Sequence, residues 1–240
     1  MSHDRLAGVF ITGTDTEIGK TTIACALAWL FRINGIKVGI MKPFATSSKI
    51  YSSKHKSKDT FSLTKEARVN DPDRTLNPVF FPIPASPAMA SEILHKPVDL
   101  NLVNKKFSYL KKKYDFLVVE GIGGVMVPIK DKVLLIDVIR SMKLPVIIVS
   151  SPKLGSINHT VLTINACIES KIPIIGLIFN QMPKHPSVVE SMTPLYVQKL
   201  CKTKTISTIP FMDQCSFKKI GLHLGRNEII KEMLSSLKTC

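Results

Sequence analysis

Short apolar runs rich in β-branched residues recur along the chain, and segments with helical patterning lie between them. The runs are strand-length and most end in Gly, Pro or Ser, which is typical of buried strands followed by turns. They cover residues 8–12, 37–41, 116–120, 146–150 and 174–179. In segment 20–34, apolar residues from Ile23 to Phe31 share one helical face. This alternation predicts an α/β fold, a doubly wound and mainly parallel sheet with helices on both faces.

No internal repeat, low-complexity linker or shift in composition marks a domain boundary. We therefore expect a single domain over residues 1–240. The irregular part is a long loop region over about 46–87, Ser/Lys-rich at 47–58 and Pro-rich at 78–87. Connections of this length in a compact domain are usually functional or mobile, so we expect 47–58 to tighten when a ligand binds.

A phosphate-binding motif follows the first expected strand. Residues 13–21 (GTDTEIGKT) follow the pattern GxxxxGK[S/T] with five residues instead of four between the two glycines, and the helical segment begins at the end of this motif. Glycines let the backbone wrap around a phosphate, and the helix N-terminus presents free N–H groups to the anion. Lys20 would reach the β- and γ-phosphates, and the hydroxyl of Thr21 would reach Mg²⁺. The motif in this setting predicts a P-loop NTPase fold that binds a nucleoside triphosphate.

Charged residues stand where two other strands are expected to end. Glu120 follows four apolar residues and precedes the glycine-rich turn 121–124, and Lys42 follows the run 37–41. Open α/β sheets bind ligands at this carboxyl edge, where a carboxylate can help to hold Mg²⁺ and a lysine can stabilise a transferring phosphoryl group. Asp59 stands in a lysine-rich loop, and by itself it predicts only a solvent-exposed helix cap.

The chain carries 33 Lys and Arg residues against 18 Asp and Glu residues, a net charge of +15. This excess raises nucleic acid, anionic membranes and phosphorylated small molecules as partners. The basic residues are 27 Lys and only 6 Arg, which argues against nucleic acid, because base and backbone recognition usually relies on bidentate Arg. Lysine runs such as 111–113 are expected to form a solvated face.

Several classes of protein are excluded by other simple features. No apolar stretch approaches the roughly 18 residues of a membrane span. The polar residues 1–5 lead into a run of only strand length, unlike a signal peptide. The five cysteines are widely spread and form no CxxC pair, so neither a disulfide framework nor a zinc site is expected. We expect a cytoplasmic, reduced protein without nucleic-acid or membrane partners.

Four motifs together resemble the dethiobiotin synthetase family. They are TGTDTEIGKT at 12–21, KP at 42–43, VEGIGG at 119–124 and KLGSINH at 153–159. They occur in the family's order and at similar separations, and the resemblance covers nearly the whole chain. It implies an ATP- and Mg²⁺-dependent cyclo-ligase of biotin biosynthesis, which joins CO2 to 7,8-diaminononanoate and closes the ureido ring of dethiobiotin, releasing ADP and phosphate. It also implies a homodimer with the substrate site at the interface.

The resemblance further implies catalytic and substrate-binding roles. Lys20 and Lys42 would stabilise the carbamate and the transferring phosphoryl group, with Thr16 beside them. The residues implied to contact the substrate are Thr16, Lys42 and Thr46, with Leu154, Gly155, Ser156, Ile157 and Asn158 contributed across the dimer interface. These last five open a helix, and a helix N-terminus suits a carboxylate.

Metal and nucleotide ligands are implied in the same way. Thr21, Asp59 and Glu120 would hold Mg²⁺, and Asn180 would read the adenine. The full implied nucleotide set is Glu17, Ile18, Gly19, Lys20, Thr21, Thr22, Asp59, Glu120, Gly121, Ile122, Gly123, Asn180, Gln181, Pro210, Phe211 and Met212. The chain departs from the usual family pattern where Gln181 replaces an aspartate, where Ala88 replaces a frequent histidine, and where Thr46 and Ser47 replace a serine and a glycine.

Two other interpretations compete with this one. A partition-type ATPase switch would carry an earlier lysine in the phosphate loop and a terminal basic amphipathic helix, and both are missing here. An enzyme that amidates carboxylates, as in cobyrinic acid amidation, normally has a glutaminase domain, for which 240 residues leave no room.

Overall fold

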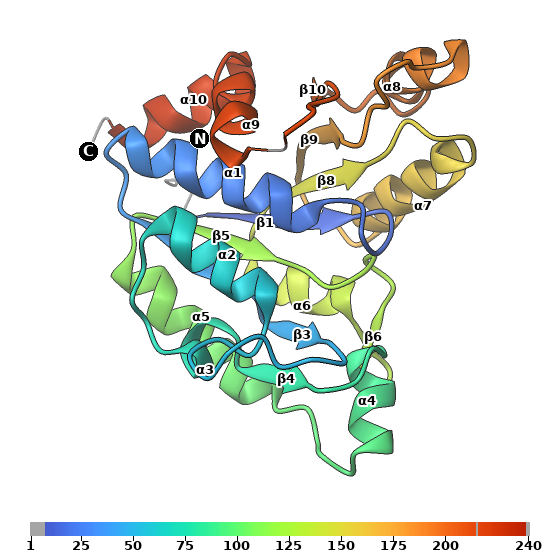
Figure 1. Cartoon of the computed structure of the whole chain (residues 1–240). Coiled ribbons are helices and arrows are strands. Elements are labelled where there is room, and N and C mark those ends of the chain that lie inside the picture. The colour runs from blue at the N-terminus through green and yellow to red at the C-terminus, as the bar shows by residue number, and fades with distance from the viewer. Residues whose placement is uncertain (1–7, 215, 239–240) are drawn as a thin grey trace.

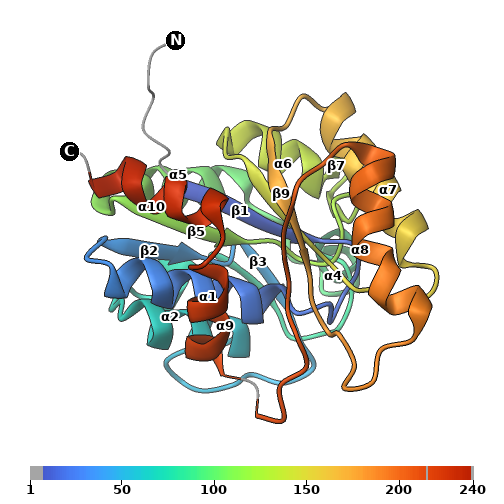
Figure 2. The ribbon, with the colours of Figure 1, turned by 90° about the horizontal axis from the view of Figure 1, so that it is seen from above.

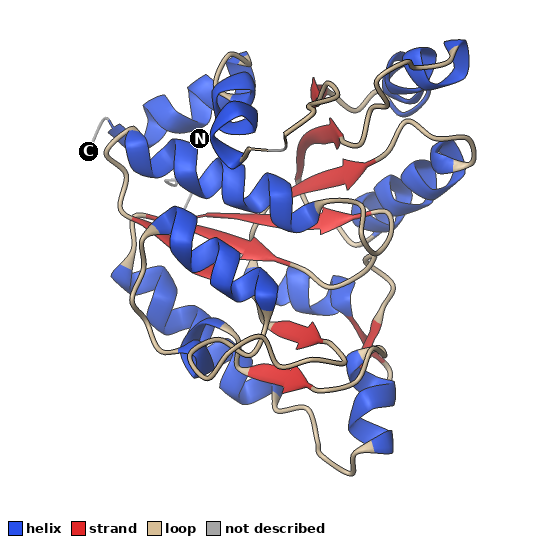
Figure 3. Ribbon diagram, viewed as in Figure 1, coloured by secondary structure: helices blue, strands red, loops and turns tan. Residues whose placement is uncertain are grey.

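Six parallel strands form the central sheet of the computed structural model, which describes residues 8–214 and 216–238 (Figures 1 and 3). They are β1 (Gly8–Gly13), β2 (Val38–Met41), β5 (Phe116–Glu120), β8 (Val146–Ser150), β9 (Ile174–Phe179) and β10 (Thr205–Thr208). From edge to edge their order is β10, β9, β8, β1, β5, β2. The five apolar runs of the sequence become the first five of these strands, so the predicted parallel sheet is confirmed.

Burial on both faces explains the apolar character of these strands. Every residue of β1, β2, β5 and β8 is buried, as expected when helices cover both sides of a parallel sheet. In β1 at the centre of the sheet, Phe10 aligns with Val119 of β5 and with Val146 of β8. The register therefore brings the carboxyl ends of neighbouring strands to the same edge.

Helices pack against both faces of the sheet. The described helices are α1 (Lys20–Ile33), α2 (Lys58–Ala67), α3 (Asp73–Leu76), α4 (Pro87–Ile93), α5 (Leu100–Lys113), α6 (Leu135–Met142), α7 (Ser156–Glu169), α8 (Val188–Cys201), α9 (Phe217–Leu224) and α10 (Glu228–Lys238). Figure 2 shows α1, α2 and α9 on one side of the sheet and α5 and α6 on the other. The apolar residues of α1 from Ile23 to Phe31 are buried, and the Phe31 ring stacks on Phe116 of β5 at 4.6 Å between centroids. The doubly wound α/β architecture is confirmed.

The expectation of a long loop over 46–87 is wrong, because this stretch contains α2, α3 and a strand, β4 (Val79–Phe81). Strand β4 pairs in parallel with β3 (Phe44–Thr46). The sequence shows no apolar periodicity for α2, because two of its four buried positions, Thr60 and Thr64, are threonines rather than aliphatic residues. A separate antiparallel pair joins β6 (Pro128–Lys130) to β7 (Val133–Leu134).

Several expectations concern residues outside the described part of the chain. Residues 1–5, Cys215 and Cys240 lie there. Within the described residues, Cys25, Cys167 and Cys201 are free thiols. Over the same residues, no helix has the length and apolar character that crossing a membrane requires.

Candidate active site

The phosphate loop joins β1 to α1 in a backbone conformation that its glycine permits. Gly19 has φ +95°, and a Cβ there would stand 2.0 Å from Nδ2 of Asn180. Glu17, two residues earlier, has φ 53°, a left-handed conformation that costs a non-glycine residue about 1–2 kcal/mol. Gly19 also precedes α1 without any side-chain cap. The first N–H groups of α1 therefore remain available to an anion.

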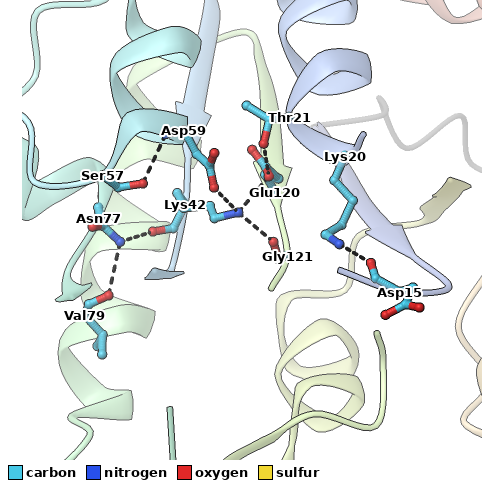
Figure 4. Close-up of polar contacts among 10 residues, drawn as sticks. All are labelled: Asp15, Lys20, Thr21, Lys42, Ser57, Asp59, Asn77, Val79, Glu120 and Gly121. Atoms are coloured by element: carbon cyan, nitrogen blue, oxygen red, sulfur yellow. Dashed lines mark hydrogen bonds and ion pairs between the residues drawn. The ribbon is translucent and has the colours of Figure 1, made fainter. Parts of the chain in front are cut away.

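Lys20, the first residue of α1, is buried beside this loop. Its Nζ donates a hydrogen bond to the carbonyl oxygen of Asp15 at 2.5 Å (Figure 4). Burial, together with the nearby Lys42 ammonium, lowers the pKa of Lys20 to about 8, although the carboxylates of Glu120 and Asp59 oppose the change. Among the described residues Lys20 thus has no direct carboxylate partner, and an anion bound in the loop would stabilise its charge.

Lys42 lies at the centre of a buried charged cluster at the carboxyl edge of the sheet (Figure 4). Its Nζ contacts Oε1 of Glu120 at 2.7 Å, Oδ2 of Asp59 at 3.0 Å and the carbonyl oxygen of Gly121 at 2.9 Å. Thr21 donates from Oγ1 to the same Glu120 oxygen at 2.7 Å. The sheet order explains the meeting, because β5 lies between β1 and β2. The ends of these three strands therefore bring Thr21, Lys42 and Glu120 together at one edge of the sheet.

The carboxylates and the ammonium of this cluster change one another's pKa. Burial by itself lowers the pKa of Lys42, but Glu120 and Asp59 outweigh it and raise that pKa above its usual value. Burial raises the pKa of Glu120, and Lys42 limits the rise. Burial also disfavours the Asp59 carboxylate, but Lys42 outweighs this and lowers the pKa of Asp59. Lys42 is therefore held as a cation at neutral pH.

Asp59 does not serve as the solvent-exposed helix cap that its local sequence suggested. Ser57 caps α2, accepting from the backbone N–H of Asp59 at 3.2 Å. The side chain of Asp59 is 39% exposed and turns instead to Lys42. A lysine-rich loop and the first turn of α2 thus place a carboxylate at the edge of the sheet.

The oxygen atoms around Lys42 suit a magnesium ion. Oε2 of Glu120 is buried and has no hydrogen-bond partner in the part of the chain that the structure describes, and Thr21 and Asp59 add a hydroxyl and a second carboxylate nearby. Magnesium prefers such oxygen ligands and is usually held by one or two carboxylates together with substrate phosphates and water. Among the described residues, no group of three or more His, Cys, Asp or Glu side chains could hold a metal alone. The donor set fits a metal that arrives with a nucleotide.

Two cavities meet at the phosphate loop. The first, here named the phosphate-loop cavity, has a volume of about 420 Å³ and is lined by Thr16, Glu17, Gly19, Lys20, Thr21, Thr22, Lys42, Ala45, Thr46, Asp59, Glu120, Ile122 and Gly123. The second, the Asn180 cavity, has a volume of about 310 Å³ and is lined by Glu17, Gly19, Thr22, Asn180, Gln181, Met182, Ile209, Pro210, Phe211, Met212 and Ile220. The three shared residues make the two cavities neighbours, with phosphate-binding groups in one and an apolar wall in the other.

Two of the expected nucleotide-binding residues line neither cavity. Ile18 is buried, and its carbonyl oxygen accepts a hydrogen bond from Asn180 at 3.1 Å. Gly121 is buried too, and it contributes its carbonyl oxygen to Lys42. A third cavity, of about 380 Å³ beside α2, contains none of the expected site residues.

The segment 154–158 lies apart from both cavities. It begins α7, with Gly155 at φ +87° as the residue before the helix. The next residue, His159, lines a different cavity of about 340 Å³ together with Thr14 and Asp15 of the phosphate loop. The first turn of α7 therefore lies near the phosphate loop but does not complete the phosphate-loop cavity of its own chain.

Some contributing residues carry no signal in the sequence. Asn77 is buried, and its Nδ2 donates to the carbonyl oxygens of Lys42 at 2.8 Å and Val79 at 3.1 Å. It thereby links the end of β2 to β4 and supports the backbone of Lys42. Ala45 and Met182 line the two cavities. Only the folded chain brings these residues to the site.

Comparison with known proteins decides the family. A family model described as an AAA domain matches residues 7–219. The ATP-dependent dethiobiotin synthetase BioD of Nitrosopumilus maritimus is 35% identical over 229 residues, covering 95% of this chain and 100% of that protein. The chain belongs to the dethiobiotin synthetase family. The enzyme of the same name from Bacillus subtilis (strain 168) is 33% identical, covering 95% of this chain and 97% of its own.

Solved structures agree with this fold at much lower sequence identity. The MinD cell division protein of Aquifex aeolicus matches with a TM-score of 0.53 and 16% identity, covering 96% of this chain and 95% of that chain. A ParA family ATPase from Chlorobium tepidum TLS matches with a TM-score of 0.51 and 17% identity, covering 97% and 99%. These likenesses show the fold alone and confirm the P-loop NTPase prediction. The sequence relatives place the chain among dethiobiotin synthetases and so disfavour the two competing interpretations.

Proposed function

We propose that this protein is an ATP-dependent dethiobiotin synthetase. One amine of 7,8-diaminononanoate adds to CO2 and gives a carbamate, and a carbamate oxygen attacks the γ-phosphorus of ATP and releases ADP. The second amine then attacks the carbamoyl carbon, closes the cyclic urea and expels phosphate. The observation that carries the proposal is the buried meeting of Lys42, Glu120 and Thr21 beside the phosphate loop, in a chain of this family.

Lys20 and Lys42 have the charge that this reaction needs. The carbamate, the γ-phosphate and the departing phosphate are all anionic, and cations fixed in a low-dielectric site stabilise such charge strongly. Both side chains line the phosphate-loop cavity, as do Thr16 and Thr46. We assign the two threonine hydroxyls to the substrate, because each can donate a hydrogen bond to a carbamate oxygen.

Thr21, Asp59 and Glu120 would hold Mg²⁺. The ion would neutralise charge on the β- and γ-phosphates and polarise the phosphorus under attack. The buried and unpartnered Oε2 of Glu120 supports this assignment. In the Asn180 cavity, the apolar wall of Pro210, Phe211 and Met212 supports a site for adenine, with the amide of Asn180 at its edge.

We further infer a homodimer in which the first turn of α7 binds the substrate carboxylate in the partner's site. Apolar residues on α7 and α8 support this inference, because they lie on the surface without cover in a single chain. Leu154, just before α7, is 89% exposed, and Leu162 and Leu195 are 61% and 72% exposed. Exposed apolar surface of this kind is typical of protein interfaces. Free cysteines support a cytoplasmic location.

Product formation with the authentic substrate tests the proposal. Purified protein should convert 7,8-diaminononanoate and bicarbonate to dethiobiotin only when ATP and Mg²⁺ are both present, as measured by mass spectrometry. Lys20→Met should abolish turnover, whereas Lys111→Met, on the exposed face of α5, should not change it. Absence of product from a preparation that still binds ATP would refute the function. Glutamine-dependent amidation of a carboxylate would point to the related amidating enzymes instead.

A further inference from the structure

Two consecutive amide side chains at the end of β9 hold two consecutive carbonyl groups of the phosphate loop. Nδ2 of Asn180 donates to the carbonyl oxygen of Ile18 at 3.1 Å, and Nε2 of Gln181 donates to that of Glu17 at 2.7 Å. Strand β9 is not a neighbour of β1 in the sheet, since β8 lies between them. These two hydrogen bonds therefore link parts of the site that the sheet does not join directly.

The carbonyl groups held in this way determine where the loop's N–H groups point. A trans peptide is planar, and its N–H points opposite to its C=O. Holding the carbonyls of Glu17 and Ile18 toward β9 turns the N–H groups of Ile18 and Gly19 to the other side of the loop. Neither of these two N–H groups donates a hydrogen bond within the described chain. They are thus directed and unpaired, as donors to a bound phosphate must be.

The loop needs external support to keep this shape. Glu17 has φ 53° and Gly19 has φ +95°, and Gln181 itself has φ 63°. Non-glycine residues persist in this left-handed region when the surrounding structure holds them there. Glu17 and Gln181, the two residues joined by this hydrogen bond, both have positive φ angles. This indicates that the fold, rather than local backbone preference, imposes the geometry.

We propose that Gln181 is a positioning residue that sets the phosphate-binding geometry of the loop through the Glu17 carbonyl, and that it does not read the base. Its amide nitrogen is already engaged with Glu17. Its effect therefore reaches the phosphates through the backbone and is the same for any base. The proposal rests on nucleotide binding at the phosphate loop, as in the proposed function, but not on which substrate is phosphorylated.

Ligands that carry only the phosphates or only the base distinguish a role in orienting the phosphate loop from a role in reading the base. Pyrophosphate has no base and adenosine has no phosphate, so we would measure the dissociation constants of both, and of ADP and GDP, by calorimetry with Mg²⁺ present. Gln181→Ala should weaken pyrophosphate and ADP binding about 5- to 20-fold, as expected for the loss of one hydrogen bond that orients the loop N–H donors toward a charged ligand. Adenosine affinity and the ratio of ADP to GDP affinity should not change.

Matched variants distinguish positioning from a general effect on folding. Gln181→Glu places a carboxylate against the Glu17 carbonyl and should weaken pyrophosphate more than Gln181→Ala does. Gln198→Ala removes another side-chain amide that is bonded to the backbone, since Oε1 of Gln198 accepts from the N–H of Thr205 at the start of β10, and it should leave pyrophosphate affinity unchanged. Thermal unfolding of each variant shows whether it is folded.

Two results would overturn the proposal. If Gln181→Ala changes the ADP to GDP ratio while pyrophosphate binds as in the unmodified protein, Gln181 reads the base. If none of the four affinities changes, the hydrogen bond to Glu17 has no role in binding. Failure of the unmodified protein to bind both pyrophosphate and ADP would instead contradict the nucleotide site itself, so failure of the proposed function is recognised separately.

Discussion

Replacing Lys42 by methionine should destabilise the protein strongly. The side chains of Lys42 and Glu120 are 4% and 1% exposed, and their charged atoms are 2.7 Å apart. Methionine fills the space of the lysine stem but leaves Glu120 buried with Thr21 as its remaining donor. Removal of one partner from a buried ion pair costs about 3–5 kcal/mol, because the other charge stays uncompensated. Asp59 is 39% exposed and adds little to this cost, since water can solvate it.

The loss should depend on pH with a definite sign. Burial already raises the pKa of Glu120, and without Lys42 this pKa rises further, so the folded variant binds a proton that the unfolded chain releases. A folded-state pKa above the unfolded value gives stability that is present at low pH and lost as pH rises through the folded pKa. Lys42→Met should therefore be closer to the unmodified protein in stability at pH 5.5 than at pH 8.

Thermal and urea unfolding at the two pH values measure this effect. For a chain of this size, 3–5 kcal/mol corresponds to a fall in Tm of about 6–20 °C. The double variant Lys42→Met/Glu120→Gln removes the unpaired charge and keeps an acceptor for Thr21, so it should recover at least half of the loss. The reasoning is refuted if Lys42→Met lies within about 1 kcal/mol of the unmodified protein at pH 8, or if its loss is the same at both pH values and the second substitution recovers nothing.

Three further predictions concern the loop and the exposed face. Because the pKa of Lys20 is about 8 without ligand, ADP binding at pH 8.5 should take up a proton, seen by calorimetry in buffers of different ionisation enthalpy, and the uptake should vanish at pH 6.5. Gly19→Ala should lose ADP binding, because its Cβ would stand 2.0 Å from Nδ2 of Asn180. The control Gly35→Ala, also at positive φ but with nothing within 4 Å of its Cβ, should lose only about 1 kcal/mol of stability in urea unfolding. Leu195→Lys on α8 should shift a dimer toward monomer in sedimentation equilibrium, and an unchanged mass would contradict that face as the interface.

Much of the fold could be predicted from the sequence because buried parallel strands leave a strong pattern. Strand β5 and strand β8 are apolar at nearly every position and were located to the residue. Helix α2 was missed because its buried face is half threonine and its flanks are rich in Ser and Lys. The pair of β3 and β4 was missed because each strand is only three residues long.

The residues of the site likewise fall into those that have a signal in the sequence and those that do not. Residues 13–21 and Glu120 could be predicted because they belong to motifs or end an apolar strand, so their position follows from the sheet. Asp59 could be assigned only through the family resemblance, since its contact with Lys42 depends on how α2 packs. Asn77 escaped prediction altogether, because a buried amide that supports a backbone carbonyl has no signature in a single sequence.

The two lysines of the site differ in their pKa values and in their ion-pair partners. Burial lowers the pKa of Lys20, whereas Glu120 and Asp59, which contact Lys42, raise the pKa of Lys42 despite its burial. Lys20 is thus a cation without a carboxylate partner in the described part of the chain, and in the proposed function a nucleotide phosphate would pair with it. Lys42 is already neutralised by the carboxylates that we assign to Mg²⁺. On that assignment Glu120 would be shared between Mg²⁺ and the Lys42 ammonium, and Lys42 would supply positive charge to the anion that forms during the reaction. The net charge of +15 thus bears on function less than do the different partners of Lys20 and Lys42.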